Sequence, residues 1–490
     1  MNSKLNRWLI ASTGSLCLVT SFAWGQKRPS FDTGWQSAEE ITETRPRPKR
    51  ESSSRPTPTR RPKMTESQEL QTAPVSRPIS ARRNEEGEAP PIRTNPSLRP
   101  VAELRGLWVV RDTLTSPESI RQMVDTAANN GFNTLFIQVR GRGDAYYRTP
   151  YEPRAEALSN APSSFDPLAL TIQEAHARGL QVHAWLNTYL AWSGHKAPKS
   201  PDHLWNAHPD WFSTDMEGHN SPVAGKDTEG AFLQPSNPEV QEHLLKVFGY
   251  VAQNYDLDGI HFDYVRYPNS RYDHSSATLK RFRNFMAESL NQDKVGQIDR
   301  RVSLNRAAWS QAYPQEWEEW RRAQVTGLVS RISDMVRLCK PGIQVTAAVG
   351  AEGMEAARYR GQEWQNWLKQ GYLDGVVLMA YSLQTAKVIQ QTQEAVGAAS
   401  GRRIYVGLGA WRLPVKDITA KIHEVRMVGA NGFCLFSYDS LKQSPEYLPT
   451  LSKAVMQQAA PPRFTSRNRR ETVIATHETD DNEDREVRRR

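Results

Sequence analysis

Cysteine is scarce in this chain, whose 490 residues contain three: Cys17, Cys339 and Cys434. Cys339 falls near the end of a predicted helix and Cys434 inside a predicted strand, so both are expected to be small core residues. Too few cysteines remain for a disulfide framework. The histidines are numerous but scattered, and no HxxxH or HxH spacing on one face stands out. The sequence therefore predicts no cofactor and no metal site.

Aromatic residues are almost absent from residues 26–100, which contain 12 prolines. Such a segment cannot bury enough apolar surface to offset the entropy of ordering it. We interpret it as a disordered, Pro/Arg-rich linker. Residues 459–490 are similarly polar and end in three arginines, so they are predicted to be a disordered charged tail.

The first 25 residues have the features of a secretory signal peptide. Lys4 and Arg7 precede an apolar run from Trp8 to Trp24, and Gly25 ends a motif with small residues at the −3 and −1 positions. The protein is therefore predicted to be secreted or periplasmic. An uncleaved membrane anchor is the alternative, although four small or polar residues interrupt the run.

Excess charge is missing from the middle of the chain. The formal net charge is +9, but only about +1 of it falls in residues 101–458. This distribution argues against a nucleic-acid partner. The basic tails could contact acidic polymers of a cell envelope, with a solvated tether as the alternative, and the sequence leaves the oligomeric state open.

A glycine-rich phosphate loop is also missing after the first predicted strand, which argues against an open doubly wound sheet. Instead, residues 101–458 contain apolar runs that alternate with helical patterns. Eight alternations over this length predict an α/β fold of the (β/α)8 TIM-barrel type. The predicted strands are Leu104–Val110, Thr134–Arg140, Gln181–Asn187, Gly259–Val265, Gln344–Gly350, Gly375–Tyr381, Arg403–Ala410 and Gly432–Tyr438.

The connections after the second, third and fourth strands are unusually long. In such a barrel they are loops of the C-terminal face, where active sites lie, so this face is expected to be elaborated for binding. Many aromatic residues fall in these loops and at the strand ends. Aromatic faces beside polar groups suit stacking on sugar rings.

No nucleophilic serine or cysteine motif follows any strand, and carboxylates take that position instead. We predict Asp263, Glu352 and Asp144 as catalytic residues, because glycoside cleavage needs two carboxyl groups that flank the bond. Each has an alternative. Asp263 could be an ionic partner of Arg266 or Arg140, Glu352 a solvated loop residue, and Asp144 the cap of a turn.

Other polar and aromatic residues at the strand ends are predicted to bind and orient the substrate. They are Arg140, Trp185, Asn187, Tyr189, Arg266, Tyr267, Tyr381 and Trp411.

Several long motifs resemble those of the bacterial glycosyl-hydrolase-like "family 10" barrels: QVRGRGDAYYRTPYEP, DPLALTIQEAHARGLQVHAWLN, NPEVQEHLL, YDLDGIHFDYVRYP and GFCLFSYDSL. The resemblance covers roughly residues 103–450. It implies a secreted or envelope-attached, glycan-active barrel whose site uses the matching Arg140, Asp144, Asn187, Asp263 and Tyr381.

By analogy with other barrel glycosidases that have G-x-x-x-D in the fourth strand, the resemblance implies that Asp263 is the nucleophile. One departure concerns Glu352. The fifth strand ends in AAVGAEG, where relatives often have a serine-proline turn. Asp144 is therefore the substitute for Glu352 as the proton donor.

The sequence thus predicts a secreted glycoside hydrolase that acts on a bacterial envelope polysaccharide, such as the glycan strands of peptidoglycan. A non-catalytic glycan-binding barrel is the main alternative. A metal-dependent hydrolase is the weaker one.

Overall fold

The computed structural model describes residues 103–220 and 228–456. The predicted signal peptide, linker and charged tail lie outside the described residues and stay predictions. All of the described residues belong to the predicted barrel region, residues 101–458.

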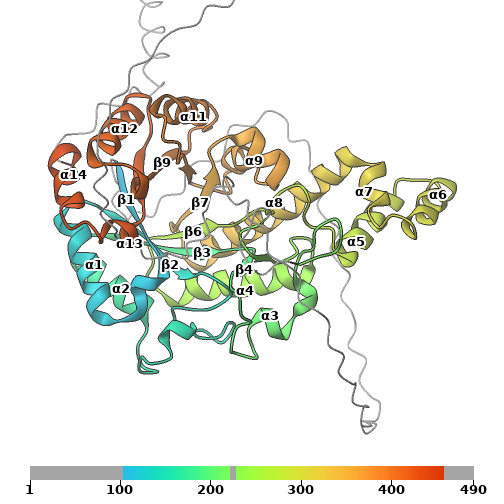
Figure 1. Cartoon of the computed structure of the whole chain (residues 1–490), viewed down its shortest axis with the longest axis horizontal. Helices are drawn as coiled ribbons and strands as arrows, with labels where there is room; N and C mark the ends of the chain where they lie inside the picture. Colours follow the sequence, from blue (N-terminus) through green and yellow to red (C-terminus); the bar gives the residue numbers. More distant parts are fainter. Residues whose placement is uncertain (1–102, 221–227, 457–490) are drawn as a thin grey trace, which may run out of the picture. The chain divides into compact units, whose positions relative to one another are not determined.

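Eight parallel strands form a closed barrel in the order β1-β10-β9-β8-β7-β6-β3-β2 (Figure 1). All eight predicted strands are present, so the TIM-barrel prediction is confirmed. Their bounds are β1 Leu104–Val109, β2 Thr134–Arg140, β3 Gln181–Asn187, β6 Gly259–Asp263, β7 Gln344–Gly350, β8 Gly375–Met379, β9 Arg403–Gly409 and β10 Gly432–Phe436. A separate antiparallel pair, β4 Leu190–Trp192 and β5 Ala231–Phe232, lies in the β3–α4 connection.

Three barrel helices begin with a capping residue followed by proline: α1 Pro117–Asn129, α2 Pro167–Ala177 and α4 Pro238–Asn254. At each, the side chain of the preceding Ser, Asp or Asn accepts a hydrogen bond from a first-turn backbone N–H. Proline then occupies the first helical position, where its missing N–H costs nothing. The other barrel helices are α8 Pro314–Cys339, α9 Gly353–Arg360, α10 Trp364–Lys369, α11 Thr385–Gly397, α12 Val415–Met427, α13 Tyr438–Leu441 and α14 Tyr447–Val455.

Two histidines, His183 of β3 and His261 of β6, are completely buried. His261 Nε2 accepts from Trp108 Nε1 (3.2 Å), and its Nδ1 lies 2.9 Å from the Thr346 hydroxyl. His183 packs edge-on against Phe136. Burial lowers the pKa of His183 to about 4 and that of His261 well below its usual value. Both imidazoles are therefore neutral packing groups rather than titrating ones.

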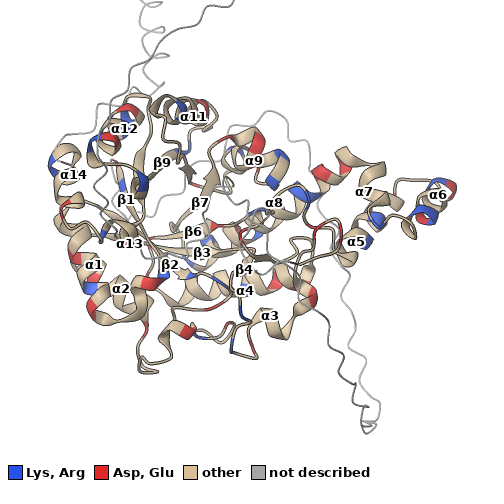
Figure 2. Cartoon of the chain, in the orientation of Figure 1, with Lys and Arg blue, Asp and Glu red and all other residues tan. Residues whose placement is uncertain are grey.

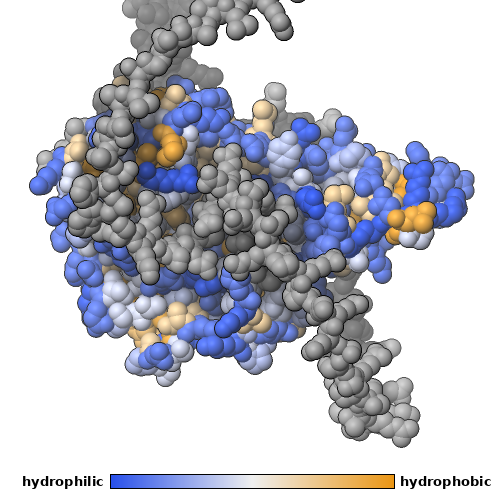
Figure 3. Space-filling model, in the orientation of Figure 1, coloured by the Kyte–Doolittle hydropathy of each residue, from blue (hydrophilic) through white to orange (hydrophobic). Residues whose placement is uncertain are grey.

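The β6–β7 connection carries an extra helical insertion, which consists of the helices α5 Ser276–Ala287, α6 Gln292–Val302 and α7 Ala308–Ala312. These helices pack on the start of α8 around their own apolar cluster, which includes Trp309, Trp317 and Trp320. The insertion projects to the right of the barrel in Figure 1. Three of its apolar side chains are exposed, Phe285, Val302 and Leu304, and Figure 3 shows an apolar patch on the same part.

Basic and acidic side chains are interspersed over the outer helices of the barrel (Figure 2). Within residues 103–220 and 228–456, no helix is long and apolar enough to cross a membrane. Cys434 is fully buried and Cys339 partly buried, and both are free thiols, as the sequence predicted.

Candidate active site

Asp263 is the last residue of β6 and lies at the C-terminal mouth of the barrel. It is in register with Asn187, the last residue of the neighbouring β3. Its Oδ2 accepts a hydrogen bond from Trp185 Nε1 (3.1 Å), and its Oδ1 accepts one from the backbone N–H of Tyr264 (2.7 Å). The carboxyl group is thus fixed by two donors at the end where barrel enzymes hold their reacting groups.

Burial raises the pKa of the Asp263 carboxyl to about 6, although the two hydrogen bonds and the charge of Arg266 oppose this rise. Among the described residues, no cation lies within ion-pair distance of Asp263. The alternative that Asp263 is an ionic partner of Arg140 or Arg266 is therefore wrong. Arg140 pairs with Glu152, and Arg266 pairs with Glu229.

The residue after Asp263 has a strained backbone. Tyr264 has φ 48°, in the left-handed region that a bulky side chain rarely adopts. Such a conformation costs about 1–3 kcal/mol and persists only where the surroundings enforce it. Its consequence here is that the Tyr264 N–H turns back onto the Asp263 carboxyl group.

A second carboxylate, Glu229, stands on the connection that leads into β5, and its negative charge acts on Asp263. Arg266 Nη2 donates to Glu229 Oε1 (2.8 Å), and Arg360 Nη1 lies 3.6 Å from the same oxygen. Burial alone would raise the pKa of Glu229, but the two arginines lower it. Glu229 is therefore ionised, and its charge contributes to the raised pKa of Asp263.

Arg266 is itself held between aromatic rings, over Tyr264 (4.9 Å) and Phe232 (5.8 Å). It is almost completely buried and serves to position Glu229. Direct sugar contact, which the sequence predicted for Arg266, is not supported by this placement.

A chain of hydrogen bonds runs across the ends of four neighbouring strands. Arg111 Nη1 donates to Gln138 Oε1 (2.9 Å), and Gln138 Nε2 donates to Asn187 Oδ1 (3.4 Å). Trp185 Nε1 is shared between Asn187 Oδ1 (3.0 Å) and Asp263. Both residues are buried. Trp185 orients the Asp263 carboxyl group directly by its hydrogen bond, and Asn187 helps to hold the Trp185 ring in place.

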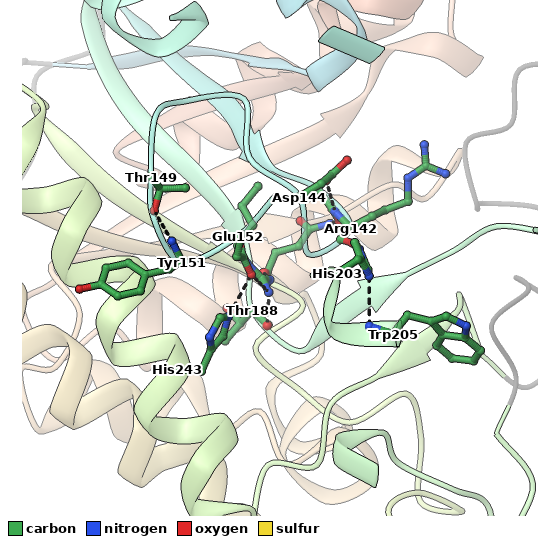
Figure 4. A network of polar contacts seen from close by, with 12 residues as sticks. Arg142, Asp144, Thr149, Tyr151, Glu152, Thr188, His203, Trp205 and His243 are labelled. Atoms are coloured by element: carbon green, nitrogen blue, oxygen red, sulfur yellow. Dashed lines mark hydrogen bonds and ion pairs between the residues drawn. The ribbon is translucent and has the colours of Figure 1, made fainter. Parts of the chain in front are cut away.

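Arg140 belongs to a buried ionic cluster with Glu152 and His243, and Figure 4 shows these last two side chains beside each other. Arg140 binds both carboxylate oxygens of Glu152 (2.7–2.9 Å) and the backbone carbonyls of Asn187 and Thr188. His243 Nε2 lies 3.2 Å from the same carboxylate. Arg140 is completely buried. The prediction that it contacts the sugar is not supported, because its guanidinium group is already engaged on both edges.

Two predicted tyrosines are also enclosed. Tyr189 is completely buried, with no hydrogen-bond partner for its hydroxyl among the described residues. The Tyr267 hydroxyl donates to the Arg321 carbonyl (3.4 Å), and its ring packs on the Arg321 guanidinium group. Both tyrosines therefore attach loops to the barrel, and neither is placed to touch a sugar.

Three partly exposed aromatic rings form a platform at the C-terminal ends of β8, β9 and β10. Tyr381 and Trp411 meet edge-on (5.1 Å), and Phe436, at the end of β10, lies 5.4 Å from Trp411. Phe436 also contacts Trp185 (6.3 Å), so the platform reaches the donor of Asp263. Tyr381 and Trp411 were predicted to bind the substrate, and the structure brings them together there.

Glu352 lies elsewhere and has a different environment. Its carboxylate pairs with Lys387 (2.6 Å) and accepts from Gln391 (3.4 Å), both on α11. Lys387 lowers the pKa of Glu352, so this half-exposed group is ionised at neutral pH. Such a carboxylate does not suit a proton donor. The catalytic prediction for Glu352 is therefore not supported, and the alternative of a solvated loop residue fits better.

Asp144 caps a turn, which was the alternative given for it. Its Oδ1 accepts a hydrogen bond from the backbone N–H of Arg142 (3.0 Å). Figure 4 shows it on the loop after β2 beside Arg142. His203, from the β3–α4 connection, lies next to this loop, with its Nε2 2.7 Å from the Arg142 carbonyl oxygen.

Sequence reasoning missed Glu229 and Phe436. Glu229 belongs to a long connection without a strand pattern, so nothing local indicated that its charge acts on Asp263. Phe436 lies inside a predicted apolar strand, where an aromatic residue gives no sign of a binding role. Within the described ranges, no group of three or more His, Cys, Asp or Glu side chains could hold a metal ion.

Residues 103–420 match the family described as glycosyl hydrolase-like 10. The chain belongs to this family.

Its relatives include glycosyl hydrolase YngK of Bacillus subtilis, 26% identical over 259 residues, and glycosyl hydrolase DigH of Escherichia coli, 22% identical over 318 residues. These alignments cover 49% and 58% of this chain, but only 44% of YngK and 63% of DigH.

Among solved structures, the glycoside hydrolase domain of PgaB (BpsB) from Bordetella bronchiseptica has a TM-score of 0.55 at 15% identity. That match covers 73% of this chain and 100% of the domain. The catalytic domain of β-amylase from Paenibacillus polymyxa has a TM-score of 0.50 at 14% identity, covering 74% and 99%. At these identities the likeness shows the barrel fold.

Proposed function

We propose that this protein is a secreted glycoside hydrolase that cleaves a bacterial envelope polysaccharide, such as the glycan strands of peptidoglycan. The observation that carries the proposal is the buried carboxyl group of Asp263 at the barrel mouth, whose pKa is raised by burial and also by the charge of a second carboxylate, Glu229. Burial raises the pKa of Asp263 to about 6, while two arginines keep Glu229 ionised. Carboxyl pairs whose pKa values are pushed apart in this way divide the roles of acid and base between them.

The roles follow from these environments. Asp263, protonated below pH 6, donates its proton to the oxygen of the leaving sugar. Glu229 keeps its negative charge beside the anomeric carbon, where positive charge develops as the bond breaks. This assignment differs from the expectation that Asp263 is the nucleophile. The Tyr381–Trp411–Phe436 platform would hold a sugar ring by stacking.

Family membership and the names of YngK and DigH support glycan hydrolysis as the activity class. Secretion is supported by the predicted signal peptide at residues 1–25, and the basic tails could hold the barrel near acidic envelope polymers. The choice of an envelope glycan as substrate rests on this predicted location.

The test is the release of new reducing ends from purified glycan strands. Asp263→Asn and Glu229→Gln should each lower kcat by at least about 100-fold, a typical loss for an acid–base residue. Glu352→Gln removes one carboxylate from the same face and should stay close to the wild type. Unchanged activity in Asp263→Asn would refute the assignment of the proton donor.

Two other results would point to the alternatives. If wild-type protein sediments with glycan but releases no reducing ends, the barrel is a binding module. If a chelator abolishes release, the enzyme depends on a metal. The anomeric form of the first product, read by NMR, then tells whether Glu229 activates water or attacks the sugar directly.

A further inference from the structure

Two arginines at the mouth of the barrel have no carboxylate partner among residues 103–220 and 228–456. Arg111 begins the 3₁₀ turn Arg111–Thr115 directly after β1, and Arg142 follows the end of β2 by two residues. Within the described part of the chain, neither guanidinium group forms an ion pair within 4.0 Å, whereas Arg140 and Arg266 each do. Partly buried cations are usually paired, so these two need an explanation.

The two side chains lie close together. Arg111 lies directly against Gly141, because a Cβ atom on this glycine would come within 2.6 Å of Arg111 Cδ and 3.1 Å of its Nη1. Arg142 is the next residue. Burial, and after it the like charge of Arg111, lowers the pKa of Arg142.

Both guanidinium groups keep unused hydrogen-bond donors. Arg111 uses Nη1 for Gln138, and Arg142 uses Nη1 for the Ser193 carbonyl (3.1 Å) while lying over the Trp192 ring (5.4 Å). The Nε atoms of both arginines are buried and have no hydrogen-bond partner among the described residues. In Figure 4 the Arg142 side chain extends away from the Glu152–His243 cluster.

Two carboxylates lie near this pair, and their charges raise the pKa of Arg142. Asp144 accepts the backbone N–H of Arg142 instead of its guanidinium group. Asp112 is exposed to solvent. Neither Asp144 nor Asp112 accepts a hydrogen bond from the Nε atoms of Arg111 and Arg142, so these donors remain available for a ligand.

The pair is connected to the carboxylates of the proposed active site. Arg111 begins the hydrogen-bond chain that reaches Asp263 through Gln138, Asn187 and Trp185. Its positive charge also acts on Tyr264, where it opposes the rise in pKa that burial causes. A group bound by Arg111 would therefore lie within the same barrel mouth.

We propose that Arg111 and Arg142 form an anion subsite that binds a carboxylate or phosphate substituent on the glycan beside the cleaved bond. Arginine suits this task, since its planar fork binds such groups with two hydrogen bonds at once. The inference rests on the proposed function for its ligand, a glycan. The inference adds that the glycan carries an acidic group and that Arg111 and Arg142 bind this group.

The experiment measures binding by the Asp263→Asn protein, in which cleavage is blocked. The probes are envelope glycan fragments with free carboxylates, and the same fragments after conversion of the carboxylates to methylamides. A second pair of probes consists of phosphorylated fragments before and after phosphatase treatment. The pair that shows the loss of affinity identifies the anion.

Removal of the recognised charge should weaken binding by about tenfold or more, as expected for a charge-assisted pair. Arg142→Gln should remove most of this preference, and Arg142→Lys should keep part of it. The matched control Arg301→Gln removes the same charge from exposed α6 and should keep the full preference. Circular dichroism would show that each variant is folded.

A preference that persists in both Arg142→Gln and Arg111→Gln would overturn the subsite, and so would equal binding of charged and neutralised fragments. The two proposals fail separately. Cleavage without a charge preference refutes only the subsite, and a charge preference without cleavage by the wild type refutes only the hydrolase activity.

Discussion

Asp263 is costly for the folded state because its carboxyl group is buried without a cation within ion-pair distance. The usual pKa of an aspartate is about 3.9, and burial raises that of Asp263 to about 6. Between these values the folded protein binds more protons than the unfolded chain. The free energy of unfolding therefore falls as pH rises through this window, by about 3 kcal/mol in total.

Asp263→Asn should remove this dependence, because an amide does not ionise. Denaturant unfolding at pH 4 and pH 7.5 would show the variant gaining stability relative to the wild type by about 3 kcal/mol at the higher pH. In the wild type, kcat/KM should decline above pH 6 as the proton donor ionises. A stability difference that does not change with pH would mean that the pKa of Asp263 is near its ordinary value.

At the scale of elements, the long loops of the C-terminal face are attached by buried charges. Glu152, on the loop after β2, receives Arg140 from β2 and His243 from α4. Burial would raise the pKa of Glu152, but Arg140 and His243 lower it to about 2. Its contribution to stability is therefore present above about pH 4.5 and is lost as pH falls toward 2.

Glu152→Gln should destabilise the protein by about 3–5 kcal/mol at pH 7, because Arg140 would then be a buried and unpaired cation. Thermal or denaturant unfolding measures this loss. The exposed pair Arg271–Glu217 offers a control, since Glu217→Gln should have little effect. Equal effects of the two variants would contradict the assigned role of the cluster.

At the scale of the whole barrel, closure depends on contacts between its first and last strands. Leu104 of β1 is in register with Gly432 of β10. Glu103, directly before β1, pairs with Arg426 of α12 (2.6 Å), and Asp439, in helix α13 after β10, accepts the Val110 N–H (2.7 Å). Both ends of this seam are thus closed by a buried carboxylate.

A double-mutant cycle tests the seam. Glu103→Gln should cost about 3–5 kcal/mol, because it leaves Arg426 as a buried and unpaired cation. Arg426→Met should cost less, because Glu103 keeps its ion pair with Arg105 (2.9 Å). The double variant should lose clearly less than the sum, since it removes both charges together. Additive losses in denaturant unfolding would show that the pair is not coupled.

The sequence by itself determined the fold and the position of Asp263. Strand and helix periodicity, the proline-capped helix starts and the polar end of β6 are local signals, and such signals do not depend on distant residues. They were sufficient to predict eight strands and to place Asp263 at the C-terminal mouth. Because these signals are local, the fold that they predicted agrees with the structure.

Only the tertiary structure decided which charges meet. Arg266 could have paired with Asp263 three residues away, but it pairs with Glu229 from a distant connection. Glu352 follows the neighbouring strand, yet α11 binds it through Lys387. The path of a long loop is set by packing rather than by its own sequence pattern, so the partner of Asp263 could not be derived from spacing. The raised pKa of Asp263 follows first from burial, to which the charge of the distant Glu229 adds.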